Sequence, residues 1–99
     1  MEVNIKEVGS GCRVELSGDM TIKNATELKR SLSEIPGNCS AIELAMEKVM
    51  ELDTSGVQLL LALNRTAAET GRRMSIVSTS TAVDRVLDTY RIRYLCTET

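Results

Sequence analysis

The sequence of 99 residues contains no histidine, no phenylalanine and no tryptophan, and Tyr90 and Tyr94 are its only aromatic side chains. Histidine is the commonest general base and the commonest neutral metal ligand, so its absence leaves any serine or cysteine nucleophile without its usual base. The scarcity of aromatic side chains requires an aliphatic core and removes the stacking surfaces that bind single-stranded nucleic acid. These absences predict that the chain is not an enzyme.

Charge and hydropathy argue against two further classes of partner. The net charge is −2 and acidic and basic residues are interspersed, so the basic surface that binds a phosphate backbone is missing. The longest apolar run, residues 59–63, is far shorter than the roughly 20 residues that cross a bilayer. Polar residues interrupt the first seven positions, where a secretory signal would be apolar. We expect a cytoplasmic protein that neither binds nucleic acid nor inserts into a membrane.

Cysteines are few and widely spaced, at Cys12, Cys39 and Cys96. An odd number at these separations is not typical of a disulfide framework, and no C-x-x-C pair is present to hold zinc. We therefore expect three buried or half-buried thiols in a reducing compartment, and no metal site.

The length suits one domain with its own core, and we predict a single domain over residues 1–99. Alternation of apolar and polar residues predicts strands over 3–8, 12–17, 41–46 and 74–78, the first two joined by a turn at 9–11. Apolar spacings of three and four predict helices over 22–35, 57–68 and 83–90. The expected boundary residues are Thr21 as the first cap, Gly71 after the second helix, and Ser80 or Thr81 as the last cap.

The predicted element order is β-β-α-β-α-β-α. Strands separated by helices imply parallel crossovers, whereas the first two strands form an antiparallel hairpin. We predict an α/β fold with a mixed sheet of four or five strands and helices packed mainly on one face. Residues 47–51 are expected to form an irregular link, and residues 91–95 a short terminal extension or a further strand.

Residues 51–56 combine carboxylates and two hydroxyls where a loop enters the second helix. Asp, Thr and Ser are preferred N-caps, so helix capping alone accounts for this segment. An aspartic protease half-site would need glycine directly after Asp-Thr, but Ser55 intervenes and a helix follows where such proteases have strands. A serine hydrolase would lack its histidine and its Gly-x-Ser-x-Gly elbow, and a phosphate-binding loop would lack its glycines and lysine.

A phosphoacceptor is the remaining chemistry that this segment supports. A serine at a helix start is accessible to a kinase, and a phosphate would add about −1.5 to −2 charges. The helix dipole and free N–H groups favour that charge, while Asp53, and Asp19 if the loops converge, oppose it. Phosphorylation of Ser55 would change the local charge of the surface without unfolding the domain, as a binding switch requires.

The sequence over residues 3–95 resembles the STAS family, the domain of bacterial anti-sigma factor antagonists. The stretch 52–60, LDTSGVQLL, is similar to the family signature: an apolar residue, Asp, Ser or Thr, a small residue, Gly and an apolar residue. Supporting similarities are LSGD at 16–19, GRR at 71–73 and STAV at 80–83. In this order and at these spacings, the short matches are fairly specific.

The resemblance implies the STAS fold and a role as an anti-sigma factor antagonist. In such members the second hydroxyl of the signature, here Ser55, is phosphorylated by an anti-sigma factor that is itself a serine kinase. The unphosphorylated form binds the kinase, the phosphorylated form releases it, and a phosphatase resets the cycle. The chain needs no cofactor of its own, because the kinase supplies ATP and Mg²⁺. The partner-binding residues implied are Asp19, Thr21, Asp53, Thr54, Gly56 and Gln58.

Several positions depart from the antagonist pattern. Many antagonists have Asp where this chain has Thr21 and Ala45, and Gly where it has Lys48. Other members of the family are small subunits of lipid-transporting ABC systems, which bind the ATPase and depend on the signature threonine, here Thr54. Still others accompany chemotaxis-type signalling proteins. Ser55 at the acceptor position favours the antagonist, with the other two roles as alternatives.

Overall fold

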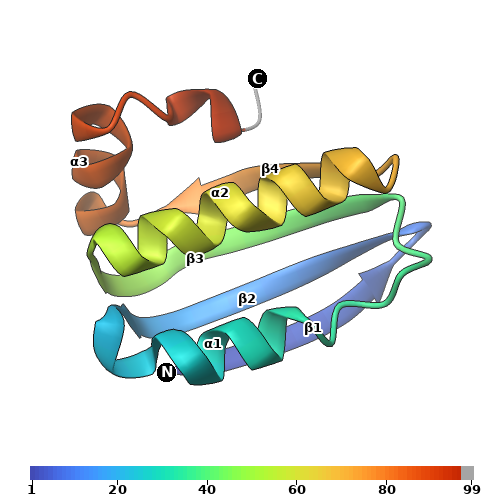
Figure 1. Ribbon diagram of the computed structural model, residues 1–99, viewed down its shortest axis with the longest axis horizontal. Helices are drawn as coiled ribbons and strands as arrows, with labels where there is room; N and C mark the ends of the chain where they lie inside the picture. The colour runs from blue at the N-terminus through green and yellow to red at the C-terminus, as the bar shows by residue number, and fades with distance from the viewer. Residues whose placement is uncertain (97–99) are drawn as a thin grey trace.

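The computed structural model describes residues 1–96, which form four strands, three α-helices and two short 3-10 helices (Figure 1). The strands are β1 (Glu2–Val8), β2 (Gly11–Met20), β3 (Ala41–Leu52) and β4 (Arg73–Thr79). The helices are η1 (Ile22–Asn24), α1 (Ala25–Leu32), α2 (Thr54–Glu69), α3 (Thr81–Thr89) and η2 (Arg93–Leu95). Helices α1 and α2 lie side by side over one face of the sheet, and α3 packs against β3 and β4 (Figure 1).

The strand order in the sheet is β1-β2-β3-β4. Strands β1 and β2 pair antiparallel, whereas β2–β3 and β3–β4 are parallel pairs. Each parallel pair is connected through a helix, α1 for the first and α2 for the second, as parallel strands require. The predicted α/β fold, with a mixed sheet and an N-terminal hairpin, is confirmed with four strands.

Strand β3 continues beyond its alternating segment. It ends at Leu52 and includes residues 47–51, so the prediction of an irregular link there is wrong. At two places in its pairing with β2, strand β3 contains one extra residue. The first lies between Ala45 and Lys48 and the second between Val49 and Glu51. Each extra residue moves the following side chains to the other face, so the period of two is lost from the sequence although the strand continues.

The first helical segment differs from the prediction at its start. The 3-10 turn η1 precedes α1, and Thr21 stands before η1 without a capping hydrogen bond from its side chain, so its predicted capping role is wrong. Ile22, which the helical spacing assigned to the buried face, is 71% exposed. The later positions of that face, Leu28, Leu32 and Ile35, are buried as predicted.

The remaining boundaries follow local chemistry. The Ser80 hydroxyl accepts the N–H of Val83 at 3.1 Å and caps α3, and Gly71 follows α2 in the left-handed conformation with a φ of 73°. Both predictions are confirmed. Residues 91–95 form no further strand, because η2 occupies residues 93–95. Cys96 then makes an isolated parallel bridge with Ile76 of β4.

The core is aliphatic, as the lack of aromatic side chains requires. Fully buried residues come from the sheet and from the helices, among them Leu44, Leu60 and Leu87. Alternate positions of β2 and β3 point to the opposite face, where Arg13 Nη2 lies 3.1 Å from Glu43 Oε1 of the neighbouring strand. This charged face explains why the helices pack mainly on one side of the sheet.

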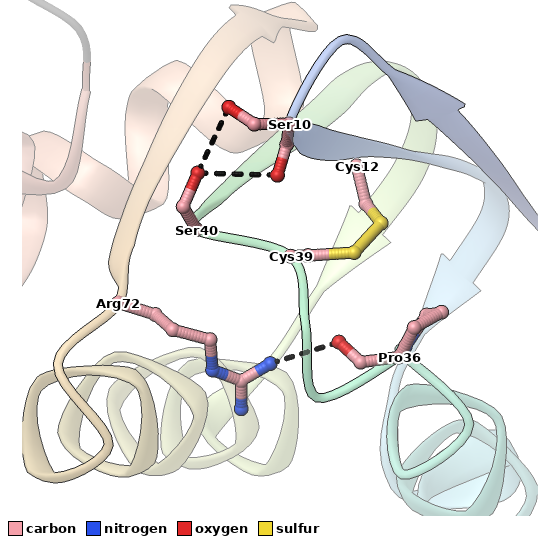
Figure 2. Close-up of a disulfide and its surroundings, with 6 residues drawn as sticks. All are labelled: Ser10, Cys12, Pro36, Cys39, Ser40 and Arg72. Carbon is pink, nitrogen blue, oxygen red and sulfur yellow. Dashed lines mark hydrogen bonds between the residues drawn. A yellow bond between two sulfur atoms is a disulfide. The ribbon is translucent and has the colours of Figure 1, made fainter.

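Cys12 and Cys39 form a disulfide, so the expectation of three free thiols is wrong for this pair. Their Cα atoms lie 5.7 Å apart, a normal disulfide separation, although 27 positions separate them in sequence. Figure 2 shows that the bond ties the loop after α1 to the start of β2, where the Ser40 hydroxyl also donates to the Ser10 carbonyl at 3.1 Å. Cys96 is a half-buried thiol, as expected, and burial raises the pKa of that thiol.

Removing the disulfide should destabilise the folded chain. Cys39→Ser releases a covalent link with a sequence separation of 27, and loop entropy then predicts a loss of roughly 3.5 kcal/mol in the free energy of unfolding. Urea denaturation without reductant measures this loss. Cys96→Ser is the matched control and should change the free energy of unfolding by about 1 kcal/mol or less. If dithiothreitol left the wild-type midpoint unchanged, the disulfide would not be a stabilising element.

Candidate functional site

Asp53 joins the starts of two helical segments. Its Oδ1 accepts the N–H of Gly56 at 3.1 Å and caps α2, while its Oδ2 accepts the N–H of Ile22 at 2.9 Å at the start of η1. Its own N–H donates to the carbonyl of Met20, the last residue of β2, at 3.2 Å. A single carboxylate therefore fixes the β2–η1 connection against the β3–α2 connection, through hydrogen bonds strengthened by its charge.

Gly56 allows the first turn of α2 to approach the sheet closely. It is buried, and a Cβ added there would overlap the Leu52 side chain and the carbonyl oxygen of Met20. The sequence analysis placed Gly56 among the partner-binding residues. Because it is inaccessible to a partner, we correct its role to packing beneath the site.

Thr54, the first residue of α2, is exposed, and its hydroxyl contacts α3. Thr54 Oγ1 lies 2.8 Å from the hydroxyl oxygen of Tyr90 in a hydrogen bond that either group can donate. The apolar spacing that predicted a helix over 83–90 counted Tyr90 as a position of the apolar face, but Tyr90 is the C-cap of α3 and is 44% exposed, so that placement is wrong. The helix ends before Tyr90, which frees the ring to turn toward the start of α2.

Ser55 is half-buried at the second position of α2. Among residues 1–96, every buried side-chain nitrogen or oxygen has a hydrogen-bond partner. The Ser55 side chain borders a surface cavity, which leaves part of it exposed to solvent. Ser55 lines a cavity of about 350 Å³ between α1 and α2, where Lys29 is the one charged lining residue among those described.

The other predicted residues lie on two sides of the α2 start. Gln58 is exposed and lines the Ser55 cavity on the α1 side. Thr21 and Asp53 line a second cavity, of about 320 Å³, that faces α3. Asp19 is half-buried near the end of β2, beside Glu51 in the parallel pairing. The structure thus gathers the predicted residues where β2 and β3 end, but divides them between the α1 side and the α3 side.

Three apolar or aromatic residues at this edge were not assigned to the site by the sequence. Ile22 lines the Ser55 cavity, Met50 lines the second cavity at 73% exposure, and Tyr90 holds Thr54. Hydrophobic residues usually predict burial, so no sequence pattern distinguishes these exposed positions from the core.

Two further features concern the described part of the chain. Residues 1–96 contain no group of three or more His, Cys, Asp or Glu side chains arranged to hold a metal ion. No helix in the same range is long and apolar enough to span a membrane.

A family sequence model described as "Mlab, STAS domain" matches residues 3–96, almost the whole chain. The chain belongs to the STAS domain family. The resemblance inferred from the signature at 52–60 and its supporting motifs is thereby confirmed. No curated protein sequence matches this STAS domain.

Solved structures of anti-sigma factor antagonists share the fold of this STAS domain. Unphosphorylated SpoIIAA aligns with a TM-score of 0.74 and 16% identity, covering 99% of this chain and 88% of SpoIIAA. SpoIIAA from Bacillus in its phosphorylated form aligns with a TM-score of 0.74 and 17% identity, and the alignment covers 99% of this chain and 91% of SpoIIAA. An anti-sigma factor antagonist from Mycobacterium paratuberculosis aligns with a TM-score of 0.83 and 14% identity, and the alignment covers 96% of this chain and 81% of the antagonist. At these identities the similarity establishes the fold alone.

Two substitutions of Asp53 should show how much its hydrogen bonds to Gly56 and Ile22 stabilise the fold. Asp53→Ala removes both acceptors and should lower the free energy of unfolding by about 2 kcal/mol, whereas Asp53→Asn keeps one acceptor oxygen and should cost about 1 kcal/mol. Urea denaturation measures both values, and amide hydrogen exchange at Ile22 and Gly56 reports which bond is lost. Glu51→Ala, which removes a neighbouring exposed carboxylate, is the control. Wild-type stability in Asp53→Ala would contradict the bridging role.

Substitution of Gly56 tests the close packing of α2. Gly56→Ala should lower the free energy of unfolding by about 1–3 kcal/mol, because the added methyl group overlaps Leu52 and the Met20 carbonyl. Gly37→Ala is the matched control, since nothing lies within 4 Å of a Cβ at that position. The midpoint of thermal unfolding should therefore be clearly lower for Gly56→Ala than for Gly37→Ala. Equal midpoints would show that α2 tolerates displacement.

Proposed function

We propose that this STAS domain is an anti-sigma factor antagonist whose partner binding is controlled by phosphorylation of Ser55. The observation that carries the proposal is the position of Ser55, which lines a surface cavity in the first turn of a helix anchored by Asp53. A kinase can reach this side chain without opening the fold. A phosphatase can reach the phosphorylated residue by the same route.

The charges around Ser55 suit a switch. A phosphate there adds about −1.5 to −2 charges. Lys29 across the cavity and the N-terminal turn of α2 favour those charges, while Asp19 and Asp53 near the strand ends oppose them. The domain therefore tolerates the modification, but the contact surface becomes more anionic. A partner packed on the unmodified surface would meet both added bulk and unpaired charge.

The proposed partner is an anti-sigma factor with serine kinase activity, and a phosphatase reverses the modification. The chain itself acts by binding, with no cofactor and no catalytic group of its own. We assign the contact surface to exposed or half-buried residues around the acceptor, namely Asp19, Thr21, Asp53, Thr54 and Gln58. We also propose a cytoplasmic location, and alkylation of thiols in intact cells would show whether the Cys12–Cys39 disulfide, unusual in that compartment, is closed there.

Phosphorylation should occur at Ser55 and should release the partner. Incubation with the cognate kinase and ATP should add one phosphate, located at Ser55 by mass spectrometry. Ser55→Ala should block modification and keep kinase binding, while Ser55→Asp should weaken binding at least about tenfold because of the added charge. Isothermal titration calorimetry measures the affinities.

Two controls make this test specific. Thr26→Ala removes another hydroxyl of the same cavity and should leave phosphorylation intact. Thr66→Asp places the same charge about three turns further along α2 and should keep kinase binding. If Ser55→Asp bound the kinase as tightly as Thr66→Asp, charge at Ser55 would not control the interaction.

A second candidate function rests on the Thr54–Tyr90 hydrogen bond. This bond presents the signature threonine on the α3 side of the helix, away from the Ser55 cavity. The alternative is an adaptor that binds the ATPase of a lipid-transporting ABC system through Thr54 and is not phosphorylated. Two variants discriminate between the functions: in an adaptor, Thr54→Val should abolish ATPase binding and Ser55→Ala should leave it unchanged. Co-purification of an ABC ATPase with the wild-type chain would favour this second function.

A further inference from the structure

The two edges of the sheet differ in how they are covered. Strand β4 forms one edge, where Cys96 makes a parallel bridge to Ile76 and η2 packs against the strand. Strand β1 forms the other edge, and no strand in residues 1–96 pairs with its outer side (Figure 1). In the same range, β1 makes no backbone–backbone hydrogen bond outside the hairpin. The outer side of β1 therefore presents free backbone donors and acceptors, to which another strand can add.

The turn of the hairpin determines which backbone groups of β1 are free. Residues 9–10 form a two-residue loop between Val8 and Gly11, which pair with each other. The pair that flanks such a loop is hydrogen-bonded, and bonded pairs alternate with unbonded pairs along an antiparallel hairpin. The backbone groups of even-numbered residues in β1 therefore point toward β2, whereas those of odd-numbered residues point outward from the sheet.

The side chains of β1 also alternate, between the two faces of the sheet. Val3 and Ile5 are half-buried and pair with fully buried residues of β2, so they lie on the face that the helices cover. Glu2, Asn4 and Lys6 alternate with them and are exposed on the opposite face. The edge thus combines two apolar side chains on one face with two opposite charges on the other.

This pattern is self-complementary in one antiparallel register. When two copies of β1 are related by a two-fold axis at Asn4, Glu2 stands opposite Lys6 of the second chain, and Val3 stands opposite Ile5. Opposite charges and paired apolar side chains both stabilise antiparallel strands. Val3 and Ile5 are also residues whose backbone groups point outward, so the register that matches the side chains matches the hydrogen bonds.

Other registers lose this match. A shift that pairs odd-numbered with even-numbered residues would place outward groups opposite inward groups. An axis at Ile5 would place Val3 opposite Glu7, and an axis at Lys6 would place two lysines opposite each other. With the axis at Val3, Lys6 would have no residue of β1 opposite it. The charges on this edge therefore favour one register and oppose the others.

Lys6 can take part without losing its partner within the chain. Its Nζ lies 3.3 Å from Oε1 of Glu15 on β2, and its side chain is 62% exposed. An ammonium group has three donors, so it can also bind a second carboxylate. Glu2 makes no ion pair in residues 1–96 and is exposed. The opposed charges are thus available to a second chain.

We propose that β1 pairs with β1 of a second copy of this chain, in a two-fold dimer whose two four-stranded sheets become continuous. The axis lies at Asn4, Val3 and Ile5 exchange backbone hydrogen bonds, and Glu2 and Lys6 form ion pairs on the exposed face. The contact is short, so we expect the dimer to dissociate on dilution. This pairing does not depend on the proposed function, because Ser55 is not part of β1.

Sedimentation equilibrium and hydrogen exchange of the 99-residue chain test the dimer. As the concentration rises to about 1 mM, the mass should increase from 10.9 kDa toward twice that value. The amides of Val3 and Ile5 should then exchange at least about tenfold more slowly, because the second strand accepts their hydrogen bonds. The amides of Asn4 and Lys6 point to β2 and should be protected at every concentration.

Two charge reversals test the register. Glu2→Lys or Lys6→Glu alone places like charges opposite each other at both ends of the contact and should weaken the dimer at least about tenfold. An equimolar mixture of the two variants should restore the dimer, because two cationic side chains then face two carboxylates. The controls Glu69→Lys and Lys48→Glu make the same changes at exposed positions outside β1 and should alter dimerisation less than about twofold.

Three outcomes would overturn the proposal. One is a mass of 10.9 kDa at every concentration up to about 1 mM. Another is a dimer that the β1 variants and their controls weaken equally, since its interface would lie elsewhere. The third is a monomer whose Val3 and Ile5 amides become protected only with a different protein, which would assign the edge to that protein. Loss of Ser55 phosphorylation in a chain that dimerises as described would affect the proposed function alone.

Discussion

The carboxylate of Asp53 is the constraint on which the rest of the site depends. Its two oxygens hold the N–H groups of Gly56 and Ile22, which belong to segments about 30 residues apart, and its backbone N–H holds the end of β2. Gly56 completes the arrangement by letting α2 rest directly on the strand ends. The positions of Thr54 and Ser55 follow from this anchor, because both lie in the turn that it fixes.

One helix start therefore presents two different surfaces. Ser55 opens toward α1 with Gln58 and Lys29, whereas the Thr54 hydroxyl is held toward α3 by Tyr90. The two adjacent hydroxyl residues of the signature therefore face different sides of α2.

Contacts with other parts of the chain hold both ends of the α1–α2 helix pair in place. Near Ser55, Asp53 ties η1 to α2. At the other end, Arg72 binds the Pro36 carbonyl, and the Cys12–Cys39 disulfide pins the same loop to the sheet (Figure 2).

The sequence by itself determined the α/β order, the aliphatic core, the caps at Ser80 and Gly71 and the STAS signature, because these depend on local periodicity, local hydrogen bonds and composition. It also placed Ser55 and Asp53 at a helix start. Tertiary structure alone decided the full length of β3, the Cys12–Cys39 pairing, the contact of Thr54 with Tyr90 and the second hydrogen bond of Asp53. Each of these joins residues distant in the chain or depends on an extra residue in a paired strand, and a single sequence carries no periodic trace of such contacts.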